Sequence, residues 1–350
     1  MKIYDITQKP FKIYGLAVTD SEKRQFWKLP PHILEEFPQY DYLGRRSAGG
    51  RVRFMTNAKT LFIRMTLAEA KEDINIPLTG SAGADIYLGK GEASVFLGYI
   101  APAEHVEERE ITVEKTFALS GEEQIVTINL PRNDHLLSMQ IGVEEGEVWE
   151  APEYTVSGSI VFYGSSITEG GCATRPGNAY TSMVSRWLDA DYRNMGFSGK
   201  ARGEIGFAEY LASFQDMSAF VMDYDHNAPS PEHLAETHEP FFQKIRAAHP
   251  DLPVLFLSRP DTDKNPEDSR KRMEIVRATY EHAREKGDEK VWFIDGASLF
   301  GENGREECTV DGTHPNTLGF MRMAERVYPV LKDCCKAAGV LGNRGIKLLP

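Results

Sequence analysis

The pattern of apolar residues changes near residue 150, and this change restricts the chain to a fold with two different halves. From about residue 50 to about residue 145, short runs of alternating apolar and polar residues recur along the chain. Such alternation, without a long helical period, is typical of antiparallel strands that bury one face, as in a β-sandwich or jelly roll. The predicted strands are 50–55, 60–65, 84–88, 94–99, 110–113, 124–130 and 137–143.

A different pattern begins after the short acidic connector 150–153. Continuous apolar runs of strand length alternate there with amphipathic stretches of helical length. Strands of this kind, separated by helices, indicate a parallel sheet that is covered on both faces. The predicted strands are 159–164, 219–223, 253–258 and 290–295, and the predicted helices are 179–188, 232–248, 267–286 and 317–337. We therefore expect a β-sandwich domain in residues 1–152 and a three-layer α/β domain in residues 153–350.

The charge balance argues against two classes of partner. The chain has 350 residues, with 40 Lys and Arg against 52 Asp and Glu, and a formal net charge of −12. This balance does not favour the basic face that nucleic-acid binding needs, nor adsorption on an anionic membrane. The first residues lack the basic and apolar segments of a secretory signal, so we expect a cytoplasmic protein.

The cysteines do not suggest a metal site. None of the four belongs to a CxxC pair or to a Cys/His cluster with the spacing of zinc ligands. We expect reduced thiols, and we predict neither a metal nor an organic cofactor. The cysteines are Cys172, Cys308, Cys334 and Cys335.

Small, polar and titratable residues follow several of the predicted strands of the second half. In an open α/β sheet, ligands bind beyond the carboxyl ends of the strands, so these residues are expected to gather around one site. The segments concerned are 164–168, 194–199, 223–227, 258–261 and 311–316.

Together these segments resemble the four sequence blocks of the SGNH, or GDSL-type, hydrolases, in the same order. Gly164-Ser165-Ser166-Ile167-Thr168 is similar to the G-D-S-L/I-T block. The resemblance implies a flavodoxin-like α/β fold, an esterase activity and a role for one residue in each block. It makes Ser166 the nucleophile, Gly199 and Asn227 oxyanion-hole donors together with the Ser166 N–H, and His314 and Asp311 the other members of a triad.

The first half also resembles part of this family. Gly83-Ala84-Asp85-Ile86-Tyr87 is similar to the G-x-D-L-Y signature of a β-domain that precedes one SGNH subgroup.

The chemistry of these residue types agrees with the implied roles. A serine hydroxyl is a weak nucleophile that needs a neighbouring base, and an aspartate can hold the histidine in the required tautomer. Two positions depart from the family pattern, because Ser165 and Asp225 replace its usual Asp and Gly. We expect catalysis to survive these changes and Asp225 to point away from the oxyanion site into a loop hydrogen bond.

Two arginines lie near the predicted site in the sequence, and the role of each can be interpreted in two ways. Arg175 and Arg259 each precede a proline in a loop that follows a predicted strand or turn. Each could orient a carboxylate or hydroxyl of the substrate, or form a salt bridge that shapes its loop.

The favoured function is hydrolysis of small O-acyl esters, with O-acetyl groups on a carbohydrate as the expected substrate. The sugar is inferred from the additional β-domain by analogy with carbohydrate esterases. The alternatives are a short-chain lipase, thioesterase or arylesterase, and a non-catalytic carbohydrate-binding protein that retains the fold. A homo-oligomer, in which the β-domain contributes to a neighbouring cleft, is left open.

Overall fold

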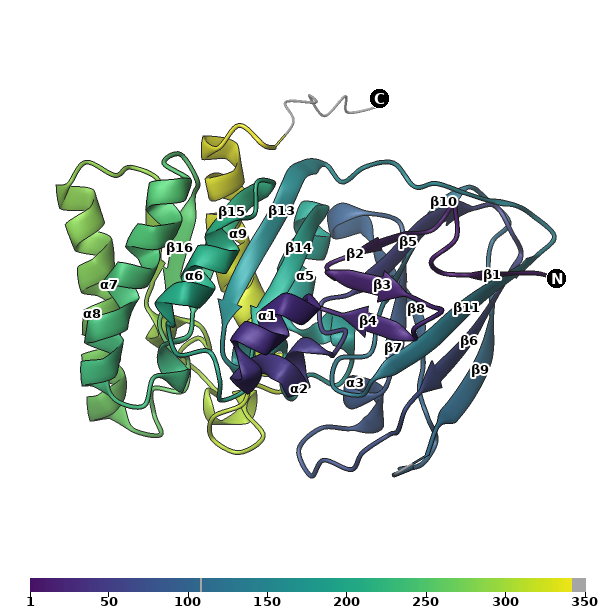
Figure 1. Cartoon of the computed structure of the whole chain (residues 1–350), viewed down its shortest axis with the longest axis horizontal. Coiled ribbons are helices and arrows are strands. Elements are labelled where there is room, and N and C mark those ends of the chain that lie inside the picture. The colour runs from purple at the N-terminus through teal and green to yellow at the C-terminus, as the bar shows by residue number, and fades with distance from the viewer. Residues whose placement is uncertain (108, 342–350) are drawn as a thin grey trace.

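The computed structural model describes residues 1–107 and 109–341, and two differently built halves lie side by side in it (Figure 1). The N-terminal half contains two antiparallel sheets. One sheet has the order β1-β11-β6-β9, and the other has the order β12-β5-β10-β7-β8, with β2 paired to β5. The first sheet consists of β1 (Lys2–Asp5), β6 (Thr60–Leu67), β9 (Ile111–Ala118) and β11 (Leu136–Glu144). The second consists of β2 (Lys12–Tyr14), β5 (Arg51–Thr56), β7 (Ala84–Leu88), β8 (Val95–Ile100), β10 (Gln124–Asn129) and β12 (Val148–Trp149).

The two sheets enclose a common apolar core, as the alternating sequence pattern predicts. In strand β6, for example, Leu61, Ile63 and Met65 are fully buried, whereas Arg64 and Thr66 are partly exposed. Val52 and Phe54 of β5 belong to the same core cluster. The prediction of an all-β sandwich for this half is confirmed.

The second half contains a five-stranded parallel sheet in the order β14-β13-β15-β16-β17. Its strands are β13 (Val156–Gly164), β14 (Ala190–Gly196), β15 (Met217–Asp223), β16 (Val254–Leu257) and β17 (Val291–Ile294). Its helices are α4 (Ser166–Glu169), α5 (Tyr180–Leu188), α6 (Ile205–Ala212), α7 (Pro231–Ala248), α8 (Pro266–Glu285) and α9 (Thr317–Ala337). The predicted three-layer α/β arrangement is confirmed.

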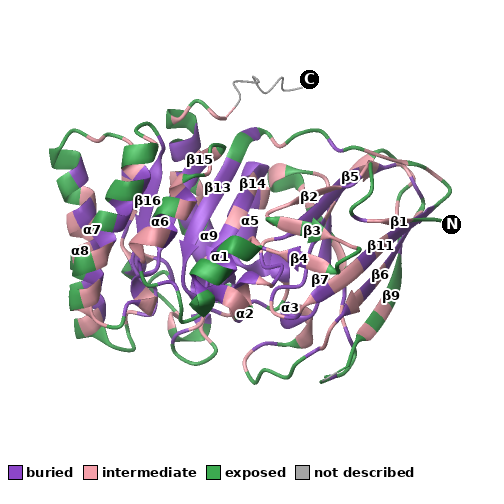
Figure 2. Ribbon diagram, in the orientation of Figure 1, coloured by how far each residue is buried: buried purple, intermediate pink, exposed green. Residues whose placement is uncertain are grey.

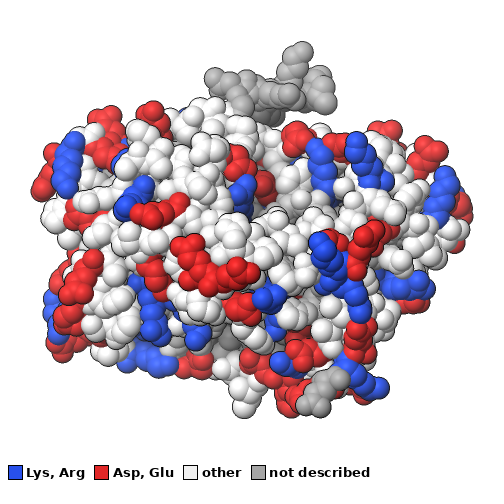
Figure 3. Space-filling model, in the orientation of Figure 1, with Lys and Arg blue, Asp and Glu red and all other residues white. Residues whose placement is uncertain are grey.

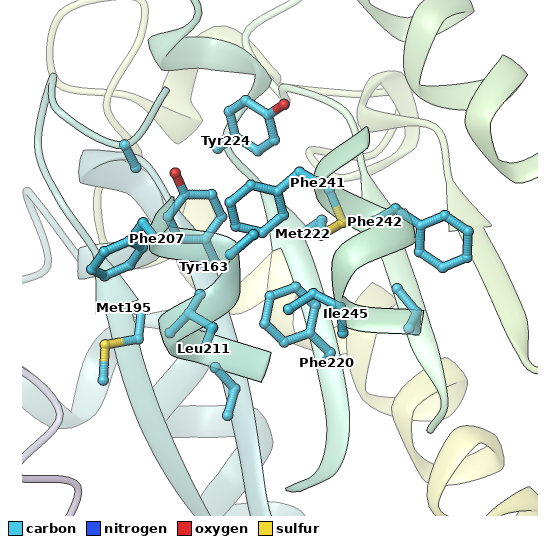
Figure 4. Packing of buried hydrophobic residues seen from close by; sticks show 14 of the residues in the cluster. Tyr163, Met195, Phe207, Leu211, Phe220, Met222, Tyr224, Phe241, Phe242 and Ile245 are labelled. Carbon is cyan, nitrogen blue, oxygen red and sulfur yellow. The ribbon is translucent and has the colours of Figure 1, made fainter. Parts of the chain in front are cut away.

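Helices cover both faces of this sheet, so most residues of its strands are buried (Figure 2). Helices α6, α7 and α8 pack on one face, where Tyr163, Phe207 and Phe241 are part of an aromatic-rich cluster (Figure 4). Helices α5 and α9 pack on the other face, around Phe162 and Phe320. Both faces are thus closed, and the carboxyl edge of the sheet is left to carry polar residues.

A short helical segment of the N-terminal half packs into the core of the α/β half. It consists of α1 (Pro31–Glu36), η1 (Pro38–Tyr40) and α2 (Asp41–Gly44), and it follows the small hairpin of β3 (Val18–Asp20) and β4 (Gln25–Trp27). Ile33 and Tyr40 lie in the same apolar cluster as Phe207, and Tyr40 contacts the Phe197 ring at a centroid distance of 4.3 Å. The two halves therefore share part of a core. A further short helix, α3 (Leu78–Ser81), lies between β6 and β7.

Candidate active site

Ser166 is presented by a sharp strand-to-helix turn at the end of β13. Ser165 is the N-cap of helix α4, and its hydroxyl accepts a hydrogen bond from the Ile167 N–H at 3.1 Å. Thr168 closes the reciprocal bond, because its hydroxyl accepts the Ser165 N–H at 3.0 Å. A Cβ on Gly164 would lie 2.2 Å from the Asp223 carbonyl oxygen, so the turn requires glycine there. The serine that replaces the family's usual aspartate is thus a helix cap.

His314 and Asp311 lie on the loop before α9 and reach Ser166 in one chain of hydrogen bonds. The distance from His314 Nε2 to Ser166 Oγ is 3.0 Å, and that from His314 Nδ1 to Asp311 Oδ2 is 2.7 Å. Because the ionised Asp311 can only accept, Nδ1 carries the proton and Nε2 is left to accept the Ser166 hydroxyl proton. This is the geometry in which an imidazole can act as a general base toward a serine.

The Asp311 carboxylate is strongly stabilised in its charged form. Burial alone would raise its pKa, but hydrogen bonds from the backbone N–H and ring of His314 and from the Thr313 N–H outweigh burial and lower the pKa to about 2. Asp311 therefore remains negative wherever the imidazole needs it.

The two other residues predicted to donate to the oxyanion follow the strands that flank β13 in the sheet. Gly199 lies in the loop between β14 and α6 and has a φ of +66°, a left-handed conformation that favours glycine. Asn227 lies in η4 (Asp225–Asn227) after β15, and its side-chain Nδ2 donates to the Phe197 carbonyl at 2.9 Å. Within residues 1–107 and 109–341, no acceptor is bonded to the backbone N–H of Ser166 or Gly199. These N–H groups are free to donate to an oxyanion.

Asp225 is directed away from this group of donors, into a loop. Its side chain is buried, and Oδ2 accepts the Arg259 N–H at 2.9 Å. Arg272 donates to the Asp225 backbone carbonyl at 2.6 Å. The residue that replaces the family's usual glycine therefore braces η4 against the neighbouring loop.

Arg175 and Arg259 are both engaged in ion pairs within the protein. Arg175 Nε lies 3.4 Å from Asp85 Oδ2, and its guanidinium stacks on the Phe96 ring at 3.8 Å. Arg259 donates to both carboxylate oxygens of Asp261, from Nε to Oδ1 at 2.8 Å and from Nη2 to Oδ2 at 2.6 Å. The contacts of both arginines fit the second of the two interpretations, a salt bridge that shapes the loop.

The N-terminal half contributes residues to the site that sequence reasoning missed. Asn75 Nδ2 donates to Asp311 Oδ2 at 3.4 Å. Arg132 donates to the carbonyl oxygens of Gly170 and Gly171 at the end of helix α4. Lys28 and Glu169 form a buried ion pair at 2.8 Å. These residues lie outside every recognisable motif, so no local pattern in the sequence could have pointed to them.

An open groove of about 750 Å³ runs along one side of the Asp311 loop. Its walls carry charged and apolar side chains, including those of Lys264, Arg305 and Val310. Charges of both signs are also mixed over the face of the molecule in Figure 3. Among the described residues, no group of three His, Cys, Asp or Glu could hold a metal ion, and no helix is long and apolar enough to cross a membrane.

Comparison with known proteins shows the family to which the chain belongs. A model of the GDSL-like lipase/acylhydrolase family matches residues 157–332, about half of the chain. The chain belongs to this family. The family acts on ester bonds, and the protein is accordingly a hydrolase of that class. Residues 1–148 match the GxDLY model, which describes the N-terminus of SGNH-hydrolase-type esterases.

Solved structures with the same two-part architecture extend the comparison. A candidate GDSL-like lipase from Bacteroides ovatus is 28% identical, with a TM-score of 0.80 over 96% of this chain and 98% of that one. The salicylyl-acyltransferase SsfX3 from a tetracycline biosynthetic pathway is 18% identical, with a TM-score of 0.77 over 95% and 97%. An acetyl xylan esterase from Butyrivibrio proteoclasticus is 14% identical, with a TM-score of 0.61 over 96% and 99%. A comparison with curated protein sequences finds no match.

Proposed function

We propose that this GDSL-family protein is a serine esterase that removes small O-acyl groups, and that O-acetyl groups on carbohydrates are its substrates. The observation that carries the proposal is the continuous chain from Ser166 Oγ through His314 to Asp311, with unbonded N–H groups beside the serine. A binding protein that had lost catalysis would have no need to keep all of these groups in register.

In the proposed mechanism, Ser166 Oγ attacks the ester carbonyl carbon while its proton passes to His314 Nε2. The carbonyl oxygen becomes an oxyanion that accepts hydrogen bonds from the N–H groups of Ser166 and Gly199 and from Asn227 Nδ2. Asp311 stabilises the imidazolium that has formed. His314 then donates the proton to the leaving alcohol, and an acyl-enzyme remains on Ser166.

A water molecule completes the cycle. His314 takes a proton from the water as its oxygen attacks the acyl carbon, and the same donors hold the second oxyanion. Collapse of this intermediate returns the proton to Ser166 Oγ and releases the carboxylic acid.

Two considerations support a small acyl group on a sugar. The structural neighbours include an acetyl xylan esterase and a family two carbohydrate esterase from Cellvibrio japonicus, whose two-part architecture covers nearly the whole of this chain. The open groove beside Asp311, whose lining includes this triad member but neither Ser166 nor His314, carries several charged side chains that could bind the hydroxyl groups of a sugar.

The proposal is tested by the release of p-nitrophenol from p-nitrophenyl acetate. Wild type is expected to hydrolyse the ester, and Ser166→Ala to lose the activity together with labelling by a fluorophosphonate probe. Ser213→Ala removes an exposed serine near the opposite edge of the sheet and is the matched control. Equal rates for wild type and Ser166→Ala would exclude the esterase mechanism.

Substrate class is tested separately. Acetate release from acetylated xylo- or manno-oligosaccharides should exceed hydrolysis of p-nitrophenyl octanoate. A preference for the octanoate would favour a lipase and remove the carbohydrate proposal, while leaving the serine mechanism intact.

A further inference from the structure

The loop 196–199, which carries the Gly199 N–H, is held by hydrogen bonds at Gly196, Phe197 and Ser198. The Gly196 N–H donates to Asn194 Oδ1 at 3.0 Å, and the Phe197 N–H donates to the Gly164 carbonyl at 2.9 Å. The Phe197 carbonyl accepts from Asn227 Nδ2. Two further bonds join this loop to a buried ion pair: the Gly196 carbonyl accepts from one member, and the Ser198 N–H donates to the other.

Lys28 is one member of this pair and comes from the N-terminal half. It lies between strand β4 and helix α1, which Figure 1 shows in front of β14. Its side chain is completely buried, its Nζ donates to the Gly196 carbonyl at 2.6 Å, and Nζ lies 4.4 Å from the centre of the Phe197 ring. The ammonium group therefore sits directly beneath the first half of the loop.

Glu169 is the other member and belongs to helix α4, one turn after Ser166. Its Oε1 accepts from Lys28 Nζ at 2.8 Å, and its Oε2 accepts the Ser198 N–H at 3.1 Å. The Ser198 bond orients the residue immediately before Gly199. One carboxylate thus connects the helix that starts at Ser166 with the loop that ends at Gly199.

We propose that Lys28 and Glu169 are a positioning pair for the oxyanion hole, so that the N-terminal half completes the catalytic site. The inference rests on the esterase function proposed above. Lys28 and Glu169 touch no reacting atom in this scheme. They act by keeping the Gly199 N–H aligned with the Ser166 N–H as charge develops on the substrate oxygen.

A buried ion pair at the junction of two halves could instead serve only to join them. The junction contains a matched example, because Arg53 is buried and its Nη2 donates to Asp189 Oδ1 at 3.0 Å. Asp189 follows helix α5 and precedes β14, at the edge of the sheet opposite to Ser166. A role in joining the halves applies to both pairs, whereas a role in catalysis applies only to Lys28 and Glu169.

The test compares Lys28→Met, Glu169→Gln and the double variant Lys28→Met/Glu169→Gln with Arg53→Met. The single variant Lys28→Met leaves the Glu169 carboxylate buried without its cation and is expected to lower Tm. The double variant removes both charges of the pair and should regain part of that loss, limited by the buried Arg132, whose charge Glu169 also stabilises. Neither restores the anchor on the Gly196 carbonyl. Both are expected to lose about 10- to 100-fold in kcat for p-nitrophenyl acetate, with KM within about twofold of wild type.

A tetrahedral analogue distinguishes a misaligned oxyanion hole from a general loss of folding stability. Phenylboronic acid adds to the serine oxygen and places a boronate oxygen where the oxyanion forms, so its inhibition constant should rise in parallel with the loss in kcat. Arg53→Met is expected to lower Tm while kcat and the inhibition constant stay close to wild type.

Three results would overturn the inference. The first is a folded double variant with the kcat of wild type. The second is an equal loss of kcat in Arg53→Met. If no Lys28 variant folds, the third result is a Glu169→Gln variant whose kcat and boronate inhibition constant are the same as those of wild type. If wild type itself neither hydrolyses esters nor binds the boronate, the proposed function fails, and that outcome is distinct from all three.

Discussion

Both carboxylate oxygens of Asp85 accept a hydrogen bond from the backbone N–H of Gly177, each at 3.1 Å. Asp85 is the aspartate of the G-x-D-L-Y segment in strand β7, and Gly177 lies in η3 (Pro176–Asn178), just before helix α5. The carboxylate is completely buried and also accepts from Asn129 Nδ2 at 2.8 Å. The most distinctive residue of the N-terminal half therefore holds a loop of the catalytic half.

This contact predicts that Asp85→Ala and Gly177→Ala both weaken the junction between the halves. The first leaves the Gly177 N–H and Arg175 without their acceptor, and we expect a loss of about 3–5 kcal/mol in the free energy of unfolding. The second places a Cβ 2.7 Å from Asp85 Oδ2 and from the Tyr87 ring, which the packing cannot accommodate. Urea denaturation measures both losses, and Asp85→Asn, which keeps one acceptor oxygen, should lose less. Wild-type stability in Asp85→Ala would contradict the role of this contact.

Asn227→Ala should reduce kcat while leaving KM nearly unchanged. Asn227 Nδ2 uses one hydrogen for the Phe197 carbonyl and has a second to donate to the oxyanion. Loss of one such donor costs about 2.7–4 kcal/mol of transition-state stabilisation, or about 10²- to 10³-fold in kcat. Steady-state kinetics with p-nitrophenyl acetate give the measurement. A rise in KM at constant kcat would instead assign Asn227 to binding of the ground state.

On the acid side of the pH–rate profile, the loss of kcat/KM should follow the binding of a single proton. Hydrogen bonds from His314 and Thr313 overcome the effect of burial and lower the pKa of Asp311 to about 2, so this carboxylate stays ionised as the pH falls toward 4. Asp311 therefore adds no slope of its own to the profile above about pH 4. A plot of log kcat/KM against pH should therefore have a slope of at most about 1 between pH 4 and pH 6. A slope of about 2 would mean that Asp311 titrates in the same range.

Asp223→Asn should be more stable than wild type, and this difference in stability should be larger at high pH than at low pH. Burial raises the pKa of Asp223 from 3.8 to about 7, although hydrogen bonds from Tyr180 and Thr168 oppose the shift. The folded state then binds this proton more tightly than the unfolded state, so wild-type stability is lost as the pH rises from about 4 through about 7, by up to about 4 kcal/mol.

The asparagine avoids this loss, because it stays neutral and keeps an acceptor for the Tyr180 and Thr168 hydroxyls. The measurement is Tm of both proteins at about pH 5 and about pH 8, and the difference between them should grow at the higher pH. A difference that is the same at both pH values would show that Asp223 does not change its protonation there.

Much of the architecture was predictable from sequence because it depends on local patterns. Alternation with a period of two residues marks a strand with one buried face, and continuous apolar runs mark strands buried on both faces. Helices α7, α8 and α9 begin and end within about one residue of the predicted stretches, since polar N-cap residues and helical periodicity are local signals. The turn that presents Ser166 is likewise encoded by a short run of small residues.

The first fifty residues were beyond such reasoning. Helix α1 has six residues and buries only Ile33 and Leu34, too few to form a periodic pattern. Its packing beside Phe207 is a long-range contact that no local feature of either segment announces.

By itself, therefore, the sequence determined the two sheet types, the order of most elements after residue 50, although not strand β14 or helix α6, and the identity of the residues that form the Ser166, His314 and Asp311 chain. Only the tertiary structure decided that Lys28 contacts the loop 196–199, that Arg175 pairs with Asp85, and that Asp225 faces Arg259. The physical reason is distance along the chain. Lys28 and Glu169 are 141 positions apart in the sequence. Their pairing is a long-range contact that forms only when folding buries both charges, so no local pattern indicates it.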